Sequence, residues 1–185
     1  MTYYGAKQLA AAFRTVRQNT IMIAEEIPED KYSFSPAPGS RTVAQTLVHV
    51  ANVPKAPLHI HGVLKLTGFE GFDFMALFGP IMAAEQNPGS KDVILAELRS
   101  EGEKFAGWLD GLSDEFLGEQ VTQAPGQDPP TKSRFEMLLS VKEHEMHHRA
   151  QLMVVERMLG IVPHLTLRMN ERIAAMQAAQ AAKKG

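Results

Sequence analysis

Four long segments of the chain carry apolar side chains at intervals of three and four residues, and proline- and glycine-rich segments separate them. The first of these stripes consists of Leu9, Phe13, Val16, Thr20, Ile23 and Ile27. Residues at this spacing share one face of an α-helix, so the pattern predicts an amphipathic helix that ends at Pro28. The chain lacks the sustained alternation of β-branched residues that is typical of strands, and it lacks glycine-rich phosphate loops. Nucleotide-binding α/β folds are therefore excluded.

A second helix is expected after the turn-rich segment 28–41. Thr42 and Gln45 have the spacing of a capping box, which predicts that the helix begins there. Pro54 and Pro57 then interrupt the helical pattern and must bend or break it. Residues 69–84 are rich in aromatic side chains but contain a Gly-Pro pair, and we expect a short helix that covers or flanks the others.

The second half of the chain predicts two more long helices and a C-terminal helix. A third helix is expected to open after Ser90 and to stop at Gly111, and residues 113–132 predict an irregular connection. Ser133 begins a second capping box, from which the fourth long helix runs to about residue 159. A last helix from about residue 166 ends in an alanine-rich tail. The sequence thus predicts an all-α fold, an antiparallel four-helix bundle with a broken second helix and a short C-terminal helix, in one domain over residues 1–185.

Charge and composition narrow the functional classes. The 185 residues include 19 Lys and Arg against 21 Asp and Glu, and no long run of positive charge marks a nucleic-acid surface. No apolar stretch is long enough to span a membrane, and the short apolar run Leu9–Phe13 does not make a signal peptide, so we expect a cytoplasmic protein without nucleic-acid or membrane partners. The absence of cysteine excludes disulfides, cysteine-ligated metal centres and a cysteine nucleophile.

Three of the seven histidines fall within five residues of the fourth helix, in the run His144-Glu-Met-His147-His148. Positions four apart in a helix differ by about 40° in direction and about 6 Å along the axis, so His144 and His148 project side by side. Both belong to the apolar stripe of this helix and point into the bundle. A shared divalent cation would satisfy two buried imidazoles, and we predict that both bind a metal. His147 is rotated by about 100° and is expected at a helix boundary or in solvent.

A third ligand is expected on another helix, because facing helices are where bundles build metal sites. His49, near the start of the second helix and flanked by apolar residues, is the candidate. His59 and His61 are two residues apart and point to different sides of a helix, so they cannot both join the site. One could line its mouth, but surface or bundle-edge positions are expected for both. His164 follows Pro163 in a predicted loop and carries no signal.

The same five residues also match H-E-x-x-H, in which the glutamate of a zinc peptidase activates water. The extended form of that motif fails, because Gln151 and Val154 stand where glycine and a third histidine belong. A peptidase also needs a sheet edge to hold its substrate, and no strands are evident. Glu145 is therefore expected to be a surface residue or to support the ligands, and an HExxH-type zinc hydrolase remains an alternative.

The arrangement as a whole resembles the DinB/YfiT-like superfamily. The resemblance is carried by Ser40-Arg-Thr-Val-Ala-Gln-Thr-Leu-Val-His49 and by His144-Glu-Met-His-His148-Arg-Ala-Gln151, with Ala150 where that family often has glycine. It implies a four-helix bundle, often a homodimer, with a divalent ion such as zinc or nickel on His49, His144 and His148. Family members of known activity are thiol-dependent transferases, so the resemblance also implies a low-molecular-weight thiol as cofactor and a small-molecule substrate.

Two further alternatives remain open at this point. In the first, a metal only staples the helices of a non-catalytic dimer, although the sequence offers no compelling fourth ligand to close such a site. In the second, the bundle holds no metal. Arg149 and Gln151 could orient the ligand imidazoles or be ordinary surface residues.

Overall fold

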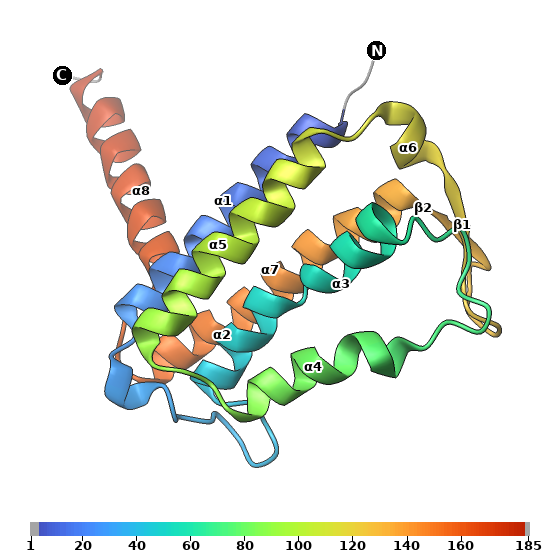
Figure 1. Ribbon diagram of the computed structural model, residues 1–185. Helices are drawn as coiled ribbons and strands as arrows, with labels where there is room; N and C mark the ends of the chain where they lie inside the picture. Colours follow the sequence, from blue (N-terminus) through green and yellow to red (C-terminus); the bar gives the residue numbers. More distant parts are fainter. Residues whose placement is uncertain (1–3, 184–185) are drawn as a thin grey trace.

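The computed structural model describes residues 4–183, and its main body is a bundle of four long helical segments (Figure 1). These segments are α1 (Ala6–Glu26), α2 (Val43–Asn52) with its continuation, α5 (Lys91–Asp110) and α7 (Arg134–Met158). The predicted all-α bundle is confirmed. Within residues 4–183, no helix is both long and apolar enough to cross a membrane.

Neighbouring helices run antiparallel in two pairs and parallel in the other two. The α1–α5 pair is antiparallel, since Arg14 meets Glu103 at 2.6 Å while the Lys91 ammonium donates to the Glu25 carbonyl at the other end. The α2–α7 pair is also antiparallel, whereas α1 runs parallel to α7 and α2 runs parallel to α5 (Figure 1). The reason is α4 (Phe74–Gln86), which returns the chain along the outside of the bundle, so that α5 starts at the same end as α2.

Both predicted capping boxes are present. The backbone N–H of Gln45 donates to the Thr42 hydroxyl at 3.2 Å, and the backbone N–H of Thr42 donates to the side-chain oxygen of Gln45 at 2.9 Å. The Ser133 and Glu136 pair repeats this arrangement at the start of α7. Each box satisfies backbone N–H groups that the first helical turn leaves without partners, and thereby fixes where α2 and α7 begin.

The second helix is broken where its prolines predict. It ends at Asn52 and resumes after Pro54 as the short α3 (Lys55–Pro57), which passes into a π-helical turn, η2 (Leu58–Val63). Proline has no N–H to donate, so the hydrogen-bond ladder cannot continue through it. The aromatic segment was predicted to form a short helix that covers or flanks the others. It forms α4, which packs beside α2.

The segment 113–132 is more ordered than expected. It forms α6 (Asp114–Gly118) and the strand β1 (Gln120–Thr122), which pairs antiparallel with β2 (Thr131–Ser133). The expectation that the chain has no strands is therefore wrong. The reason is their length, because three residues are too few to show a periodic pattern.

The last helix, α8 (His164–Ala182), has 19 residues and projects away from the bundle (Figure 1). The sequence analysis predicted that His164 lies in a loop. This is wrong, because His164 is the first residue of α8. The imidazole is buried, and its Nε2 lies 3.3 Å from the Asn19 side-chain oxygen on α1. This contact anchors the start of α8, whereas residues 167–183 are all exposed.

The bundle core has two apolar clusters with a buried charged layer between them. One cluster gathers around Ile23, Leu47 and Leu98, and the other around Phe13 and Phe105. Between them, the Arg17 guanidinium donates to the Glu145 carboxylate and also to the backbone carbonyl oxygens of α5 and α2. The Arg17–Glu145 pair thus joins α1 to α7 at the residue that follows His144.

Candidate metal centre

The structure brings His49, His144 and His148 together. The Nε2 atom of His144 lies 3.2 Å from Nε2 of His49 and 3.2 Å from Nε2 of His148. The three ligand atoms are all within 4.8 Å of one another, and no fourth histidine or carboxylate among the described residues joins them. Two of the candidate ligands therefore come from α7 and one from α2, the two helices on which the sequence analysis places them.

The hydrogen bonds of the outer ring nitrogens define the protonation of the inner ones. His49 Nδ1 lies 2.6 Å from Glu85 Oε1, and His148 Nδ1 lies 2.9 Å from Gln151 Oε1. A carboxylate and an amide oxygen only accept, so the neutral form of each ring carries its proton on Nδ1 and presents a lone pair at Nε2. The single N–H of His144 cannot satisfy two lone pairs, whereas a cation between the three nitrogens can.

The spacing of the nitrogens also fits a metal. Zinc–nitrogen bonds of about 2.0–2.1 Å in tetrahedral geometry place two ligand nitrogens about 3.3 Å apart. The two Nε2–Nε2 separations that involve His144, both 3.2 Å, agree with this value. The donor set of three imidazoles suits zinc, nickel and other first-row ions.

The electrostatics of the site favour the neutral forms of His144 and His148. Burial, followed by the neighbouring imidazoles, lowers the pKa of His144 to about 4, and burial also lowers the pKa of His148. A neutral imidazole has the lone pair that a metal requires. Near neutral pH these two side chains are thus in the ligand form.

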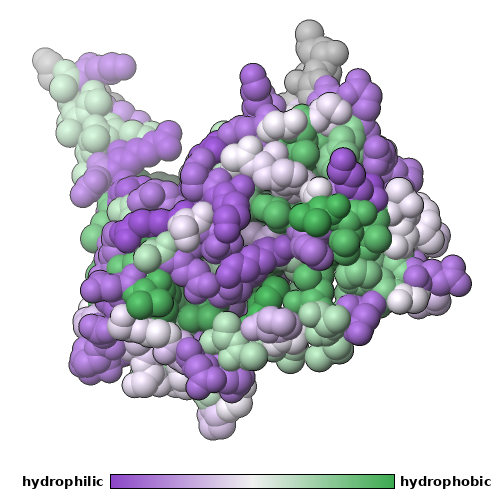
Figure 2. Space-filling view, in the orientation of Figure 1, coloured by the Kyte–Doolittle hydropathy of each residue, from purple (hydrophilic) through white to green (hydrophobic). Residues whose placement is uncertain are grey.

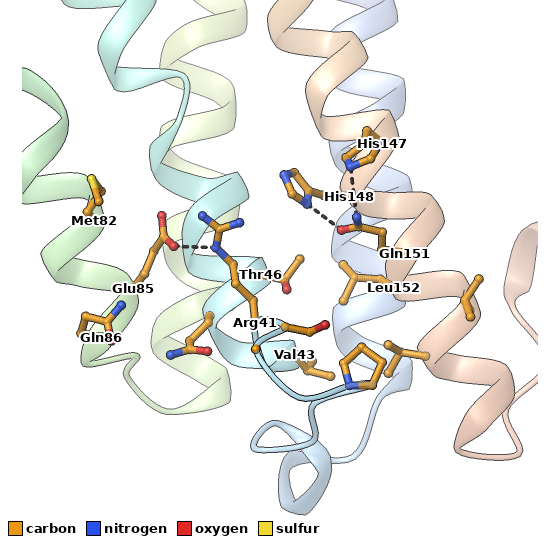
Figure 3. A pocket seen from close by; sticks show the side chains of 16 residues that line it. Arg41, Val43, Thr46, Met82, Glu85, Gln86, His147, His148, Gln151 and Leu152 are labelled. Atoms are coloured by element: carbon orange, nitrogen blue, oxygen red, sulfur yellow. Dashed lines mark hydrogen bonds and ion pairs between the residues drawn. The ribbon is translucent and has the colours of Figure 1, made fainter. Parts of the chain in front are cut away.

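Glu85 is a supporting residue that the sequence analysis missed. It lies on α4 and is 5% exposed, with one carboxylate oxygen on His49 and the other 2.7 Å from Arg41 Nε (Figure 3). Burial disfavours its charged form, but the hydrogen bonds from Arg41 and His49 outweigh that effect and lower its pKa. A carboxylate on the outer nitrogen of a ligand histidine orients the ring and makes it a stronger ligand. A glutamate in an otherwise apolar helix was the available signal.

Of the two roles predicted for Gln151, the structure shows the contact with a candidate ligand imidazole. Its side-chain oxygen accepts from His148, and its amide group lies 3.0 Å from His147 Nε2 (Figure 3). His147 is exposed and outside the ligand group, as expected. The prediction for Glu145 is wrong: it is 2% exposed and neither lies at the surface nor contacts a ligand, because its carboxylate pairs with Arg17.

The remaining histidines lie outside the ligand group. His59 is half-buried in η2. His61 is 1% exposed, and its Nδ1 accepts a hydrogen bond from the Arg134 guanidinium at 2.9 Å. Burial and the Arg134 charge lower its pKa to about 4. His61 also lines the cavity that His49 and His144 line, so the favoured expectation of a surface or bundle-edge position is wrong for this residue.

Two cavities meet at the histidines. One, of about 950 Å³, is lined by His49, His61 and His144 and by aromatic residues from α4. The other, of about 910 Å³, is lined by Arg41, His147 and His148 (Figure 3). Each of the three histidines thus lines a cavity, which a purely structural metal site does not need.

The sequence profile of the DinB superfamily matches residues 12–152, which is most of the chain and includes all three histidines. The chain belongs to the DinB superfamily. Among curated proteins, it is 25% identical over 160 residues to the uncharacterized protein YjoA of Bacillus subtilis, a match that covers 84% of this chain and 91% of YjoA.

Solved structures share the fold of this DinB superfamily member. YfiT of Bacillus subtilis, described as a probable metal-dependent hydrolase with an unusual four-helix bundle topology, superposes with a TM-score of 0.67 at 15% identity, over 87% of this chain and 91% of YfiT. A DinB-like protein from Bacillus cereus gives a TM-score of 0.66 at 18% identity, over 88% and 97% of the two chains. The crystal structure of YjoA gives 0.58 at 22% identity, over 83% and 92%.

Proposed function

We propose that this protein is a metal-dependent transferase that joins a low-molecular-weight thiol to a small electrophile, with a zinc or nickel ion held by His49, His144 and His148. The observation that carries the proposal is the convergence of three imidazole nitrogens at a point open to two cavities. Three protein ligands leave a coordination position free, which is typical of catalytic rather than structural sites. The resemblance to thiol-dependent transferases and the absence of cysteine both support an external thiol as the nucleophile.

The chain's own residues prepare the site. Glu85 and Gln151 hold the rings of His49 and His148 so that the Nε2 atoms face inward. Arg41 holds Glu85 and keeps a positive charge beside the site. When bound, a divalent ion lowers the pKa of a thiol, so that the sulfur reacts as an anion near neutral pH. Transfer to an electrophile would form a carbon–sulfur bond and release the leaving group, and the thiol proton would be lost to solvent.

A metal-dependent hydrolase is the second candidate, and the description of YfiT favours it. In that reaction water takes the place of the thiol. Glu145 could not serve as the base, because its carboxylate is held by Arg17 inside the bundle. A zinc hydrolase that uses the H-E-x-x-H glutamate is thus disfavoured by this geometry.

We also propose that the protein is a cytoplasmic homodimer, on the family resemblance.

Activity with defined reagents tests the proposal. Zinc- or nickel-loaded protein is incubated with glutathione, cysteine or bacillithiol and with monobromobimane, and thioether formation is followed by fluorescence. We expect a metal-dependent rate above the uncatalysed reaction that is lost in His148→Ala and kept in His147→Ala. Hydrolysis of p-nitrophenyl acetate by the same samples, with no thiol transfer, would favour the hydrolase instead.

A further inference from the structure

The two cavities lie end to end along one groove between α2, α4 and α7. On α7, residues 136–144 line one cavity and residues 147–155 line the other. On α2 and its continuation, the same division falls between residues 43–46 and residues 49–61. Arg41, Met82 and Glu85 line both cavities, and the Arg41–Glu85 ion pair therefore marks the boundary, beside the three histidines.

The cavity on the η2 side, which we call the aromatic chamber, has a predominantly apolar wall. Phe74, Phe78 and Ile81 line it from α4, and Ile60 and Phe69 line it from the preceding segment. The Phe69 and Phe74 rings contact each other with centroids 5.3 Å apart, yet Phe74 remains 37% exposed. Hydrophobic side chains also lie along the hollow between α4 and the α3–η2 segment in the space-filling view (Figure 2). Such a wall is built to bury an apolar ligand.

The length of the aromatic chamber follows from α7. Glu136 lines its far end and His144 lines the end at the candidate metal site. Eight residues of α-helix span about 12 Å. A ligand with its reactive group at His144 can therefore place a substituted aromatic ring or a branched alkyl chain against Phe74 and Phe78, before the charged far end at Glu136.

The cavity on the other side, which we call the polar groove, has a larger share of polar lining than the aromatic chamber, although apolar residues such as Val43 and Leu152 also line it. Thr46, Gln86, His147 and Gln151 line it together with Arg41 (Figure 3). Arg41 uses Nε to hold Glu85, while its two terminal nitrogens make no hydrogen bond to the described part of the chain. The other oxygen of the same Glu85 carboxylate holds His49, which places the guanidinium beside the candidate ligands. A guanidinium with free N–H groups beside a metal site is suited to a carboxylate or another small anion.

We propose that the aromatic chamber binds the apolar body of one substrate while the polar groove binds a small anionic co-substrate through Arg41, so that the two molecules meet at the three histidines. The proposal rests on the proposed function and adds to it which compartment takes which substrate class. It makes the anionic molecule the thiol and the apolar molecule the electrophile. Chemical complementarity supports this assignment, since an aromatic wall offers little to a hydrophilic anion.

Binding to the polar groove is tested with cobalt-loaded protein, whose visible spectrum responds when a thiol sulfur binds the ion. Mercaptoacetate and cysteamine are thiols of similar size with opposite charge on the far group. We expect Arg41→Gln to weaken mercaptoacetate about tenfold, the order expected for one charged hydrogen bond, while cysteamine is weakened much less or not at all. Equal losses for both thiols would overturn the role of Arg41, because they would mean that the variant only disturbs the ion through Glu85.

Binding to the aromatic chamber is tested without metal, by the fluorescence of N-phenyl-1-naphthylamine, a neutral apolar probe. We expect Phe74→Ala and Phe78→Ala to weaken the probe about tenfold, in line with the loss of a buried aromatic contact. Met176→Ala, which removes an exposed apolar side chain of α8, is the control and should bind the probe as the wild type does. Unchanged binding in both phenylalanine variants would overturn the assignment of the chamber.

The two probes together test the division into compartments. We expect cobalt-loaded protein to bind mercaptoacetate and N-phenyl-1-naphthylamine at the same time, with little change in the affinity for either. Mutually exclusive binding would overturn the proposal, because it would mean that one molecule fills both cavities. Failure of the protein to take up cobalt would instead overturn the proposed function, and the fluorescence experiment would still decide whether the chamber binds apolar ligands.

Discussion

The carboxylate of Glu145 lies 2.9 Å from Nε of Arg17, in a pair whose side chains are 3% and 4% exposed. Arg17 completes its shell with two backbone carbonyl oxygens, one on α5 and one on α2. Glu145 follows a candidate metal ligand directly in the chain, but the helical rotation of about 100° turns it into the bundle core. The pair therefore contributes to how the helices meet and leaves the metal site without the glutamate of an H-E-x-x-H peptidase.

We expect Glu145→Gln to destabilise the fold and to leave metal binding intact. Removing one charge of a buried ion pair leaves the other uncompensated, at a cost of about 3 kcal/mol. Urea denaturation measures the loss, and elemental analysis of the folded variant measures the metal. Glu143→Gln, an exposed neighbour on the same helix, is the control. A Glu145 variant of normal stability that has lost a metal-dependent activity would contradict this role and restore the peptidase interpretation.

Glu85→Ala should weaken metal binding without removing a ligand. The His49 ring loses the carboxylate that fixes its tautomer and orientation. Loss of such a supporting contact lowers metal affinity about 10–100-fold. Competition with a chelating indicator measures the affinity, and Gln86→Ala, the next residue and an exposed one, is the control. Equal affinities in the two variants would show that His49 does not depend on Glu85.

His147 and His148 are adjacent but should behave differently. His148→Ala removes an inward-facing nitrogen and should abolish tight metal binding. His147→Ala removes an exposed imidazole whose hydrogen-bond partner is the amide group of Gln151 and whose ring packs edge-on against His148, and it should bind the metal almost as the wild type does. The same competition assay compares them. Loss of the ion in the His147 variant would mean that the ligand group has been assigned wrongly.

The pH dependence of stability should carry a contribution from Glu156 on α7. This side chain is fully buried, and burial together with the Glu26 carboxyl raises its pKa from 4.5 to about 8. Between these two pH values the folded protein holds a proton that the unfolded chain releases, so this group lowers stability as pH rises. Glutamine does not ionise, and Glu156→Gln should therefore gain stability relative to the wild type from pH 5 to pH 8. Denaturation at both pH values measures the gain, and a difference that does not change with pH would contradict the raised pKa.

The helical segments could be predicted from the sequence because their determinants are local. The capping boxes at Thr42 and Ser133, the break at Pro54 and the stop at Gly111 each depend on residues a few positions apart. The direction of neighbouring helices could not be predicted in this way. It depends on α4 returning the chain along the bundle, which no local pattern records.

The same limit applies to the candidate metal site: its histidines could be predicted from the sequence, and the residues that support them could not. His144 and His148 are visible as a helical pair, and His49 followed from bundle geometry and the family resemblance. Glu85 and Arg41 were missed because they come from α4 and from the loop before α2, and only the tertiary fold brings them to His49. Glu145 was placed wrongly for a related reason, since its partner Arg17 lies 128 residues away in the chain.

The central claim is that His49, His144 and His148 form one divalent-metal site. The most direct test is elemental analysis of protein purified without a histidine tag, together with the His49→Ala and His148→Ala variants. The account predicts about one zinc or nickel ion per chain in the wild type and loss of that ion in both variants. A wild-type protein that stays metal-free after reconstitution with zinc and with nickel would contradict it.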